Sequence, residues 1–218
     1  MEKEFWLTKW EAKEITWDQQ DPNPFLLEYF GHFNLQPGSR IFVPLCGKNI
    51  DMLWLANQGY QVIGVDLSLK ACQLFFSEYQ IPYEQSKKGQ FEVLTSEKIT
   101  LLAGDFFDLD RTLLGEVEGV YDRAALVALP LETRAQYALK MIDLMPPYAQ
   151  MLIVTLDFDQ AQIPGPPFSV SGFEIQKLFG ERFHLLALYN QPFLDIPPHL
   201  CAKGLNQAQT LVFRLAPL

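Results

Sequence analysis

An apolar segment, a short turn and a second apolar segment ending in an acid follow one another over residues 41–66. They read Ile41-Phe-Val-Pro-Leu-Cys-Gly-Lys-Asn-Ile-Asp51 and Val62-Ile-Gly-Val-Asp66. In nucleoside-binding α/β domains the ligand lies beyond the carboxyl ends of parallel strands, and an acid roughly 20 residues after the glycine turn accepts the ribose hydroxyls. Gly47 and Asp66 are 19 positions apart. This layout predicts a nucleoside-binding α/β domain, and the single glycine argues against a pyrophosphate-bearing cofactor.

Length, charge and cysteine usage limit the number of domains, the possible partners and the cellular compartment. The 218 residues favour one domain over residues 1–218. The 26 acidic and 17 basic residues give a net charge of −9, which argues against nucleic acid or membrane partners. Three scattered cysteines and three scattered histidines favour a reduced, cytoplasmic protein without a metal site. No targeting or membrane-spanning stretch is expected, because long apolar runs are lacking.

Apolar periodicity predicts helices and strands that alternate through most of the chain. Aromatic-rich helices over 4–12 and 22–34 form an expected N-terminal helical cover, residues 1–35. Strands are expected at 40–45, 62–66, 91–94, 99–103, 119–122, 148–157, 183–189 and 210–215. Further helices are expected at 50–58 with Asn49 as cap, from Ser68 to 79, at 131–145, and at 171–179 behind a Ser171–Glu174 capping box. The polar stretch 80–89 reads as a mobile linker.

Six blocks of residues carry a family resemblance. They are Trp6-x-x-x-Trp10, Pro44-Leu-Cys-Gly-Lys48, Val62-Ile-Gly-Val-Asp-Leu-Ser68, Gly104-Asp-Phe-Phe-Asp108, Tyr121-Asp-Arg-Ala-Ala-Leu126 and Gly165-Pro-Pro-Phe168. With these blocks in order over nearly its whole length, the chain resembles the thiopurine S-methyltransferases of the S-adenosylmethionine-dependent superfamily. The resemblance implies a class I methyltransferase fold, a Rossmann-like three-layer sandwich. Its seven-stranded sheet is mostly parallel, and its last strand is antiparallel.

The resemblance also implies site residues for S-adenosyl-L-methionine and its acceptor. Cofactor contacts carry over by motif to Trp10, Leu45, Asp66, Asp105, Phe106 and Arg123. Substrate contacts are expected at Trp17 and Phe168. Arg123 is the expected catalytic residue, because a cation raises the thiolate fraction of an attacking thiol. The family often has Glu in place of Asp66 and Phe-His in place of Trp17-Asp18, and the second difference concerns the substrate side.

Each of these residues also has a purely structural explanation. The tryptophans could be ordinary core aromatics. Asp66 could be a solvated acid beside a helix start and Asp105 a turn acid. Arg123 could form a salt bridge with Asp122 or another acid. Cys46 is expected to be a small packed residue, because methyl transfer needs no enzyme nucleophile.

The implied activity is methyl transfer to the sulfur of small aromatic or heterocyclic thiols by a monomeric enzyme. An alternative is a methyltransferase for small thiols, halides or selenium and tellurium compounds. A non-catalytic cofactor-binding protein is an alternative of a different class. A nicotinamide oxidoreductase is disfavoured, because Pro44-Leu-Cys-Gly-Lys-Asn49 lacks the glycines of a pyrophosphate turn.

Overall fold

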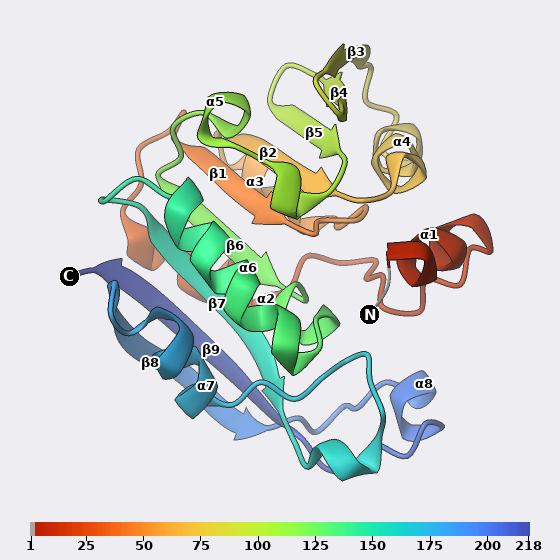
Figure 1. Cartoon of the computed structure of the whole chain (residues 1–218), viewed down its shortest axis with the longest axis vertical. Helices are drawn as coiled ribbons and strands as arrows, with labels where there is room; N and C mark the ends of the chain where they lie inside the picture. The colour runs from red at the N-terminus through yellow and green to blue at the C-terminus, as the bar shows by residue number, and fades with distance from the viewer. Residues whose placement is uncertain (1–2) are drawn as a thin grey trace. The chain divides into compact units, whose positions relative to one another are not determined.

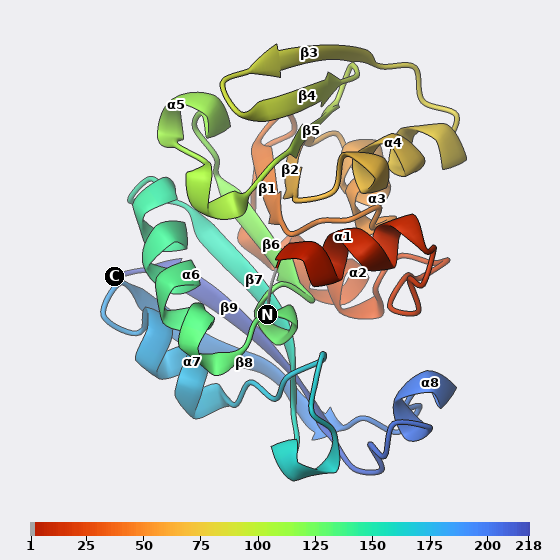
Figure 2. The same cartoon turned by 45° about the vertical axis from the view of Figure 1, so that its right-hand side comes forward.

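The computed structural model describes residues 3–218 and resolves them into two compact units (Figure 1; Figure 2). The first unit ends at Tyr121, and the second is Asp122–Leu218. The boundary falls within strand β6 (Gly119–Arg123). The expectation of one domain over the whole chain stays a prediction.

The first unit begins with the two expected helices. They are α1 (Lys3–Glu11) and the shorter α2 (Pro24–Tyr29), which continues as a 3-10 turn, η1 (Phe30–Phe33). The side chain of Asn23 accepts a hydrogen bond from the Phe25 N–H and so caps α2. In both views α1 lies beside α4 (Leu69–Glu78) (Figures 1 and 2). The remaining helices of this unit are α3 (Asp51–Asn57), η2 (Phe106–Asp108) and α5 (Arg111–Leu114).

Six strands form the sheet of the first unit, in the order β3-β4-β5-β2-β1-β6. Besides β6, they are β1 (Arg40–Pro44), β2 (Gln61–Asp66), β3 (Glu84–Lys88), β4 (Phe91–Thr95) and β5 (Ile99–Ala103). Strand β1 pairs in parallel with β2 and β6, and β2 pairs in parallel with β5. In this register Pro44 pairs with Val65, and Asp66 with Ala103. The carboxyl ends of β1, β2 and β5 therefore lie side by side at one end of the sheet, where the sequence predicts the ligand.

Strand β3 lies within residues 80–89, where the sequence predicted a mobile linker, so that prediction is wrong for these five residues. All five of its residues are exposed and it pairs antiparallel with β4, so it forms an edge of this sheet. An exposed edge strand needs no alternation of apolar and polar residues, so the usual two-residue signal is missing. Lys87 and Lys88 are the kind of charged residues that keep such an edge from pairing with other chains.

The sheet of the second unit has three antiparallel strands in the order β7-β9-β8. They are β7 (Gln150–Asp157), β8 (Phe183–Pro192) and β9 (Gln209–Pro217). Figure 1 shows α6 (Leu131–Leu144) and α7 (Gly172–Phe179) on one face of this sheet. Short helical turns complete the unit: η3 (Leu126–Ala128), η4 (Gln160–Gln162) and α8 (Pro198–Cys201). The antiparallel last strand is confirmed, whereas the expected count of seven strands is wrong, since residues 3–218 hold nine.

The predicted helix caps have mixed outcomes. The side chain of Ser68 accepts the Ala71 N–H at 3.1 Å, which confirms it as the cap of α4. Helix α3 starts one residue later than expected, with Ile50 as N-cap, although the Asn49 side chain accepts the Asp51 N–H at 3.0 Å. Ser171 caps α7 by accepting the Glu174 N–H at 3.2 Å. Glu174 does not close the capping box, because its carboxylate binds Arg134 Nη1 at 2.7 and 2.8 Å.

A buried carboxylate ties the N-terminal segment to the first sheet. Asp51 is fully buried and accepts hydrogen bonds from the Asn23 N–H at 2.7 Å and the Tyr121 hydroxyl at 2.8 Å. These donors come from before β1 and from β6, so one side chain connects three segments far apart in sequence. Within the described residues, no helix combines the length and apolarity needed to cross a membrane.

We expect Tyr121→Phe to lower the free energy of unfolding by about 1–3 kcal/mol, because it removes a donor from a buried carboxylate. Urea denaturation monitored by circular dichroism measures the change. Tyr83→Phe is the matched control, since Tyr83 is 37% exposed. Equal stability of the two variants would show that the Tyr121 hydroxyl contributes nothing.

Candidate functional site

The carboxylate of Asp66 lies at the end of β2, where the sequence predicts the ribose-binding acid. It is 9% exposed. Oδ2 accepts the Gly47 N–H at 2.8 Å, and Oδ1 accepts the Ser68 N–H at 2.9 Å. The solvated-acid alternative is therefore wrong, because this carboxylate is buried and joins the turn after β1 to the start of α4.

Burial has a measurable effect on this acid. Desolvation raises the pKa of Asp66 from 3.8 to about 6, and the Ser68 and Gly47 N–H groups lower it only in part. At neutral pH the group is mostly ionised, so it acts as an acceptor. A carboxylate offers about four acceptor positions. Two are used by the backbone, which leaves capacity for the two hydroxyls of a ribose.

The turn after β1 has an unusual backbone. Leu45 and Gly47 have φ angles of +46° and +53°, in the left-handed region that favours glycine. A non-glycine residue held there stores strain, which is frequent at ligand sites. A Cβ at Gly47 would lie 2.9 Å from Trp10 Cζ2 and 4.0 Å from Asp66 Oδ2. Gly47 is therefore needed both for its φ angle and for the close approach of the Trp10 indole.

Three indoles form an aromatic cluster in the N-terminal segment. Trp17 makes edge contacts with Trp6 and Trp10, at centroid distances of 5.4 and 5.9 Å. Trp10 is 3% exposed and packs on Gly47. Trp10 thus lies against the turn that carries the predicted cofactor contacts, and the core-packing explanation also holds for it. The acceptor contact of Trp17 stays a prediction.

The two predicted adenine contacts follow β5. Asp105 caps η2 by accepting the Phe107 N–H at 2.9 Å, and its other oxygen forms an ion pair with Lys3 of α1. This is the geometry of the turn-acid alternative. The ring of Phe106 is 5% exposed and stacks on Phe42 at 6.4 Å. Both adenine contacts therefore stay predictions.

The second unit holds the other two predicted site residues. Arg123 ends β6 and is followed by Ala124, whose φ is +69°. The salt bridge from Arg123 to Asp122 is absent, because Asp122 is fully buried and binds the Tyr137 hydroxyl at 2.6 Å and the Leu126 N–H at 3.4 Å. Burial raises the pKa of Asp122 to about 6, although the Tyr137 hydroxyl lowers it in part.

Phe168 lies in the proline-rich loop of the second unit. Its N–H donates to the Val127 carbonyl at 2.7 Å, and Arg134 lies 6.0 Å from its ring centroid. A Cβ at Gly165 would lie 2.5 Å from the Phe168 ring, so only glycine fits beneath it. The ring is thus held within the loop, and its substrate contact stays a prediction.

Two residues near the N-terminal segment were not assigned a role from the sequence. Within the described part of the chain, the buried Oε1 of Gln19 has no hydrogen-bond partner, which makes it a free acceptor for a ligand N–H or O–H. Lys48 is 5% exposed and binds Asp18 and Glu78. The Gly-Lys pair after β1 signals a turn, but nothing in the sequence shows which acids approach Lys48.

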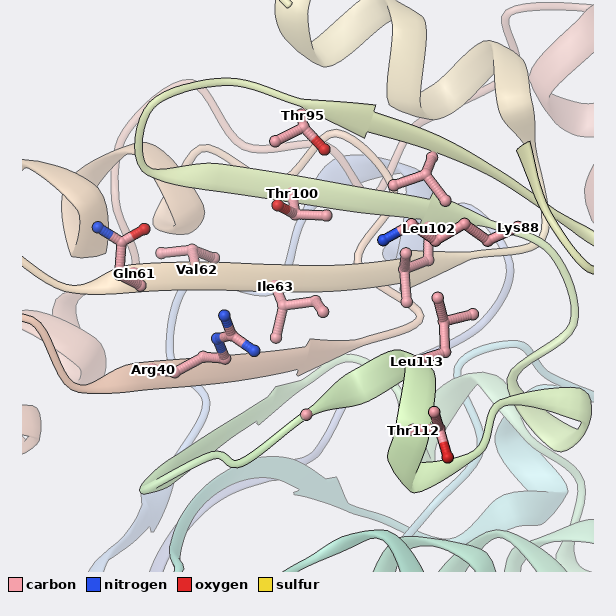
Figure 3. Close-up of a pocket in the computed structure, with 12 residues that line it drawn as sticks. Arg40, Gln61, Val62, Ile63, Lys88, Thr95, Thr100, Leu102, Thr112 and Leu113 are labelled. Carbon is pink, nitrogen blue, oxygen red and sulfur yellow. The ribbon is translucent and has the colours of Figure 1, made fainter. Parts of the chain in front are cut away.

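A hollow of about 340 Å³ in the first unit lies apart from the predicted residues (Figure 3). Arg40 and Gln61 line it, and they open β1 and β2, whereas Asp66 closes β2. Its lining also includes Ile63 and Leu102, so the hollow extends along the strands. Nucleoside sites lie beyond the carboxyl ends of parallel strands, and none of the predicted site residues lines this hollow.

Two of the three free cysteines are buried. Cys46 and Cys72 are buried, and burial raises the pKa of both thiols well above the usual value. A Cβ at Gly64 would lie 2.7 Å from Cys46 Sγ, which shows tight packing of that thiol. Across residues 3–218, no group of three or more His, Cys, Asp or Glu side chains is placed to hold a metal ion.

Sequence comparisons identify close relatives over almost the full length. The family model described as thiopurine S-methyltransferase matches residues 1–216. A thiopurine S-methyltransferase of Shewanella oneidensis is 43% identical over 217 residues, which cover 98% of this chain and 100% of that protein. One of Nitrosospira multiformis is 40% identical over 215 residues, with 99% and 98% covered.

A structural comparison agrees on the fold. The 1,6-didemethyltoxoflavin-N1-methyltransferase of Burkholderia thailandensis, solved with S-adenosylhomocysteine, matches with a TM-score of 0.65. The match covers 99% of this chain and 86% of that one at 16% identity. The chain therefore has the α/β fold of S-adenosylmethionine-dependent methyltransferases.

We expect the affinity for S-adenosylhomocysteine to fall as the pH drops through about 6, the pKa of Asp66. If only the ionised carboxylate accepts the ribose hydroxyls, the Kd at pH 5 should be about tenfold higher than at pH 7.5. Isothermal titration calorimetry measures this, and Asp66→Asn should bind weakly with little pH dependence.

Protonation of Asp66 should not unfold the protein over this range. Its pKa is higher in the folded state than the ordinary 3.8, so the folded state binds more protons between 3.8 and about 6. Its contribution to the free energy of unfolding therefore rises as the pH falls through that window. An affinity that is constant from pH 7.5 to 5 would remove Asp66 from the binding site.

Proposed function

Because the chain belongs to the thiopurine S-methyltransferase family, we propose that it transfers a methyl group from S-adenosylmethionine to the sulfur of small aromatic or heterocyclic thiols. The observation that carries this proposal at the site is the buried Asp66 carboxylate, held by Gly47 and Ser68 with acceptor capacity to spare. The single glycine of the turn suits a nucleoside without phosphates.

The chain's own residues suit this cofactor. Asp66 accepts the ribose hydroxyls, and the left-handed turn at Leu45 and Gly47 presents backbone groups and clearance. Trp10 packs over that turn, where an indole face favours a neighbouring cation. Asp105 and Phe106 are assigned to the adenine by the family motif.

When bound, S-adenosylmethionine would supply a methyl carbon activated by its sulfonium. The thiolate sulfur of the acceptor would bond to that carbon as the bond from the methyl to the sulfonium sulfur breaks, and S-adenosylhomocysteine would leave. The protein's task is to orient the acceptor and exclude water. Arg123 is assigned by motif to favour the thiolate form of the acceptor and guide it. The family motif assigns contacts with the acceptor to Trp17 and to Phe168. No protein nucleophile takes part, which agrees with the packed Cys46 thiol.

We propose that the protein works as a cytoplasmic monomer in one domain, with residues 1–35 as the cover. Three free cysteines, two of them buried, suit a reducing compartment. Analytical ultracentrifugation of the full chain, with and without S-adenosylhomocysteine, measures the oligomeric state.

The direct test follows S-adenosylhomocysteine release with a panel of acceptors. We expect turnover with heteroaromatic thiols, and weaker turnover with alkyl thiols, iodide and selenium compounds. Preference for halide or selenium acceptors would transfer the assignment to that alternative activity. Binding of S-adenosylmethionine without product from any acceptor would indicate a non-catalytic cofactor-binding protein.

Arg123→Ala should lower kcat/KM for thiols by about 10- to 100-fold, a loss of roughly 1.4–2.7 kcal/mol of transition-state stabilisation. A thiol with a pKa near 8.5 should lose about an order of magnitude more than a heteroaromatic thiol already ionised in the assay, because only the first needs help to form its thiolate. Steady-state kinetics with both acceptors measures the difference.

Lys177→Ala is the control, since Lys177 is an exposed cation on α7 of the same unit. Arg123→Lys should keep part of the activity, because it keeps the charge. Unchanged kinetics in Arg123→Ala would exclude Arg123 from the mechanism.

A further inference from the structure

Lys48 occupies a position that the reaction does not explain. It directly follows Gly47, whose N–H binds the Asp66 carboxylate. The Lys48 side chain is 6% exposed, and its ammonium forms ion pairs with Asp18 and, at 2.6 Å, with Glu78. A lysine is almost never buried to this extent unless it is paired.

The two partners come from different segments. Glu78 is the last residue of α4, and its side chain is 42% exposed. Asp18 belongs to the segment between α1 and α2, and its side chain is 12% exposed. The ion pair between Lys48 and Asp18 is thus the more buried of the two, and it connects the turn after β1 with the N-terminal segment.

Asp18 directly follows Trp17, the central ring of the indole cluster. Trp17 makes edge contacts with Trp6 and Trp10, and Trp10 packs on Gly47. By fixing Asp18, the ion pair therefore also fixes Trp17 and, through its ring contacts, the Trp6 and Trp10 indoles next to the turn after β1. Burial lowers the pKa of Lys48, but the hydrogen bonds to Asp18 and Glu78 more than offset this and raise it, so Lys48 is a cation at neutral pH.

We propose that Lys48 is a positioning residue. Its ion pair with Asp18 fastens the Trp17 segment to the turn after β1, so that cofactor affinity depends on this pair. The proposal deepens the proposed function and rests on its placement of the nucleoside at Asp66. The Asp18 carboxylate supplies a counter-charge for the buried Lys48 ammonium.

The chain offers a matched control pair. Lys70 of α4 binds Glu11 at the end of α1 at 2.7 Å, so it also joins the N-terminal segment to α4. Its side chain is 31% exposed and that of Glu11 is 70% exposed. Exposed pairs contribute little, whereas loss of one partner from a buried pair leaves an uncompensated charge.

The experiment compares Lys48→Met with Lys70→Met in the full chain. Tryptophan emission and acrylamide quenching are recorded without ligand, and the Kd for S-adenosylhomocysteine is measured by calorimetry. For Lys48→Met we expect red-shifted emission, stronger quenching and a Kd at least tenfold higher. For Lys70→Met the emission maximum should match that of wild type. The quenching constant and the Kd should stay within twofold of the wild-type values. Wild-type emission and affinity in Lys48→Met would overturn the proposal.

Asp18→Asn carries the same test if Lys48→Met does not fold, because Lys48 then keeps Glu78 as a partner. The same red shift and loss of affinity are expected, and Lys48→Arg should restore most of the affinity by keeping the charge. Wild-type behaviour of Asp18→Asn would overturn the proposal. A wild-type chain that binds no S-adenosylhomocysteine would refute the proposed function and with it the effect on affinity. The emission, which is read without ligand, would still decide whether Lys48 holds the Trp17 segment.

Discussion

The buried carboxylate of Asp66 is the constraint on which the first unit's site depends. Asp66 is the last residue of β2. Its carboxylate accepts the N–H of Gly47, in the turn after β1, and the N–H of Ser68, in the turn after β2. Burying this acid raises its pKa to about 6, so the fold bears a cost to keep it ionised at neutral pH. Such a cost is expected where a buried group serves a ligand, because a stability optimum would place an apolar residue there.

The same turn concentrates several other demands. Leu45 and Gly47 take left-handed conformations, and the Trp10 indole approaches so closely that a side chain at Gly47 would collide with it. Lys48 then extends from this turn to Asp18 and Glu78. Backbone strain, close packing and a buried ion pair therefore meet within four residues, and any change there affects both the turn and the N-terminal segment that packs on it.

Local signals predicted much of the fold, and the failures have physical reasons. The cap of α4 at Ser68 follows from a side chain that bonds its own helix, so it is readable from adjacent residues. Strand β3 was missed because a fully exposed edge strand carries no apolar pattern. The Ser171–Glu174 capping box failed in one half, because Arg134, 40 residues away, provides a stronger partner for Glu174.

The sequence alone determined the strand-turn-acid order, the position of Asp66 after the second strand and the family resemblance, because each of these is read from short runs of neighbouring residues and their order in the chain. Only the tertiary structure decided which groups meet there. Lys48 and Asp18 are 30 residues apart, and Gly47 and Asp66 are 19 apart. These contacts exist because parallel pairing places the carboxyl ends of β1 and β2 side by side, and because the N-terminal segment packs on the turn after β1. Hydrogen bonds and ion pairs between distant segments leave no periodic trace in a single sequence.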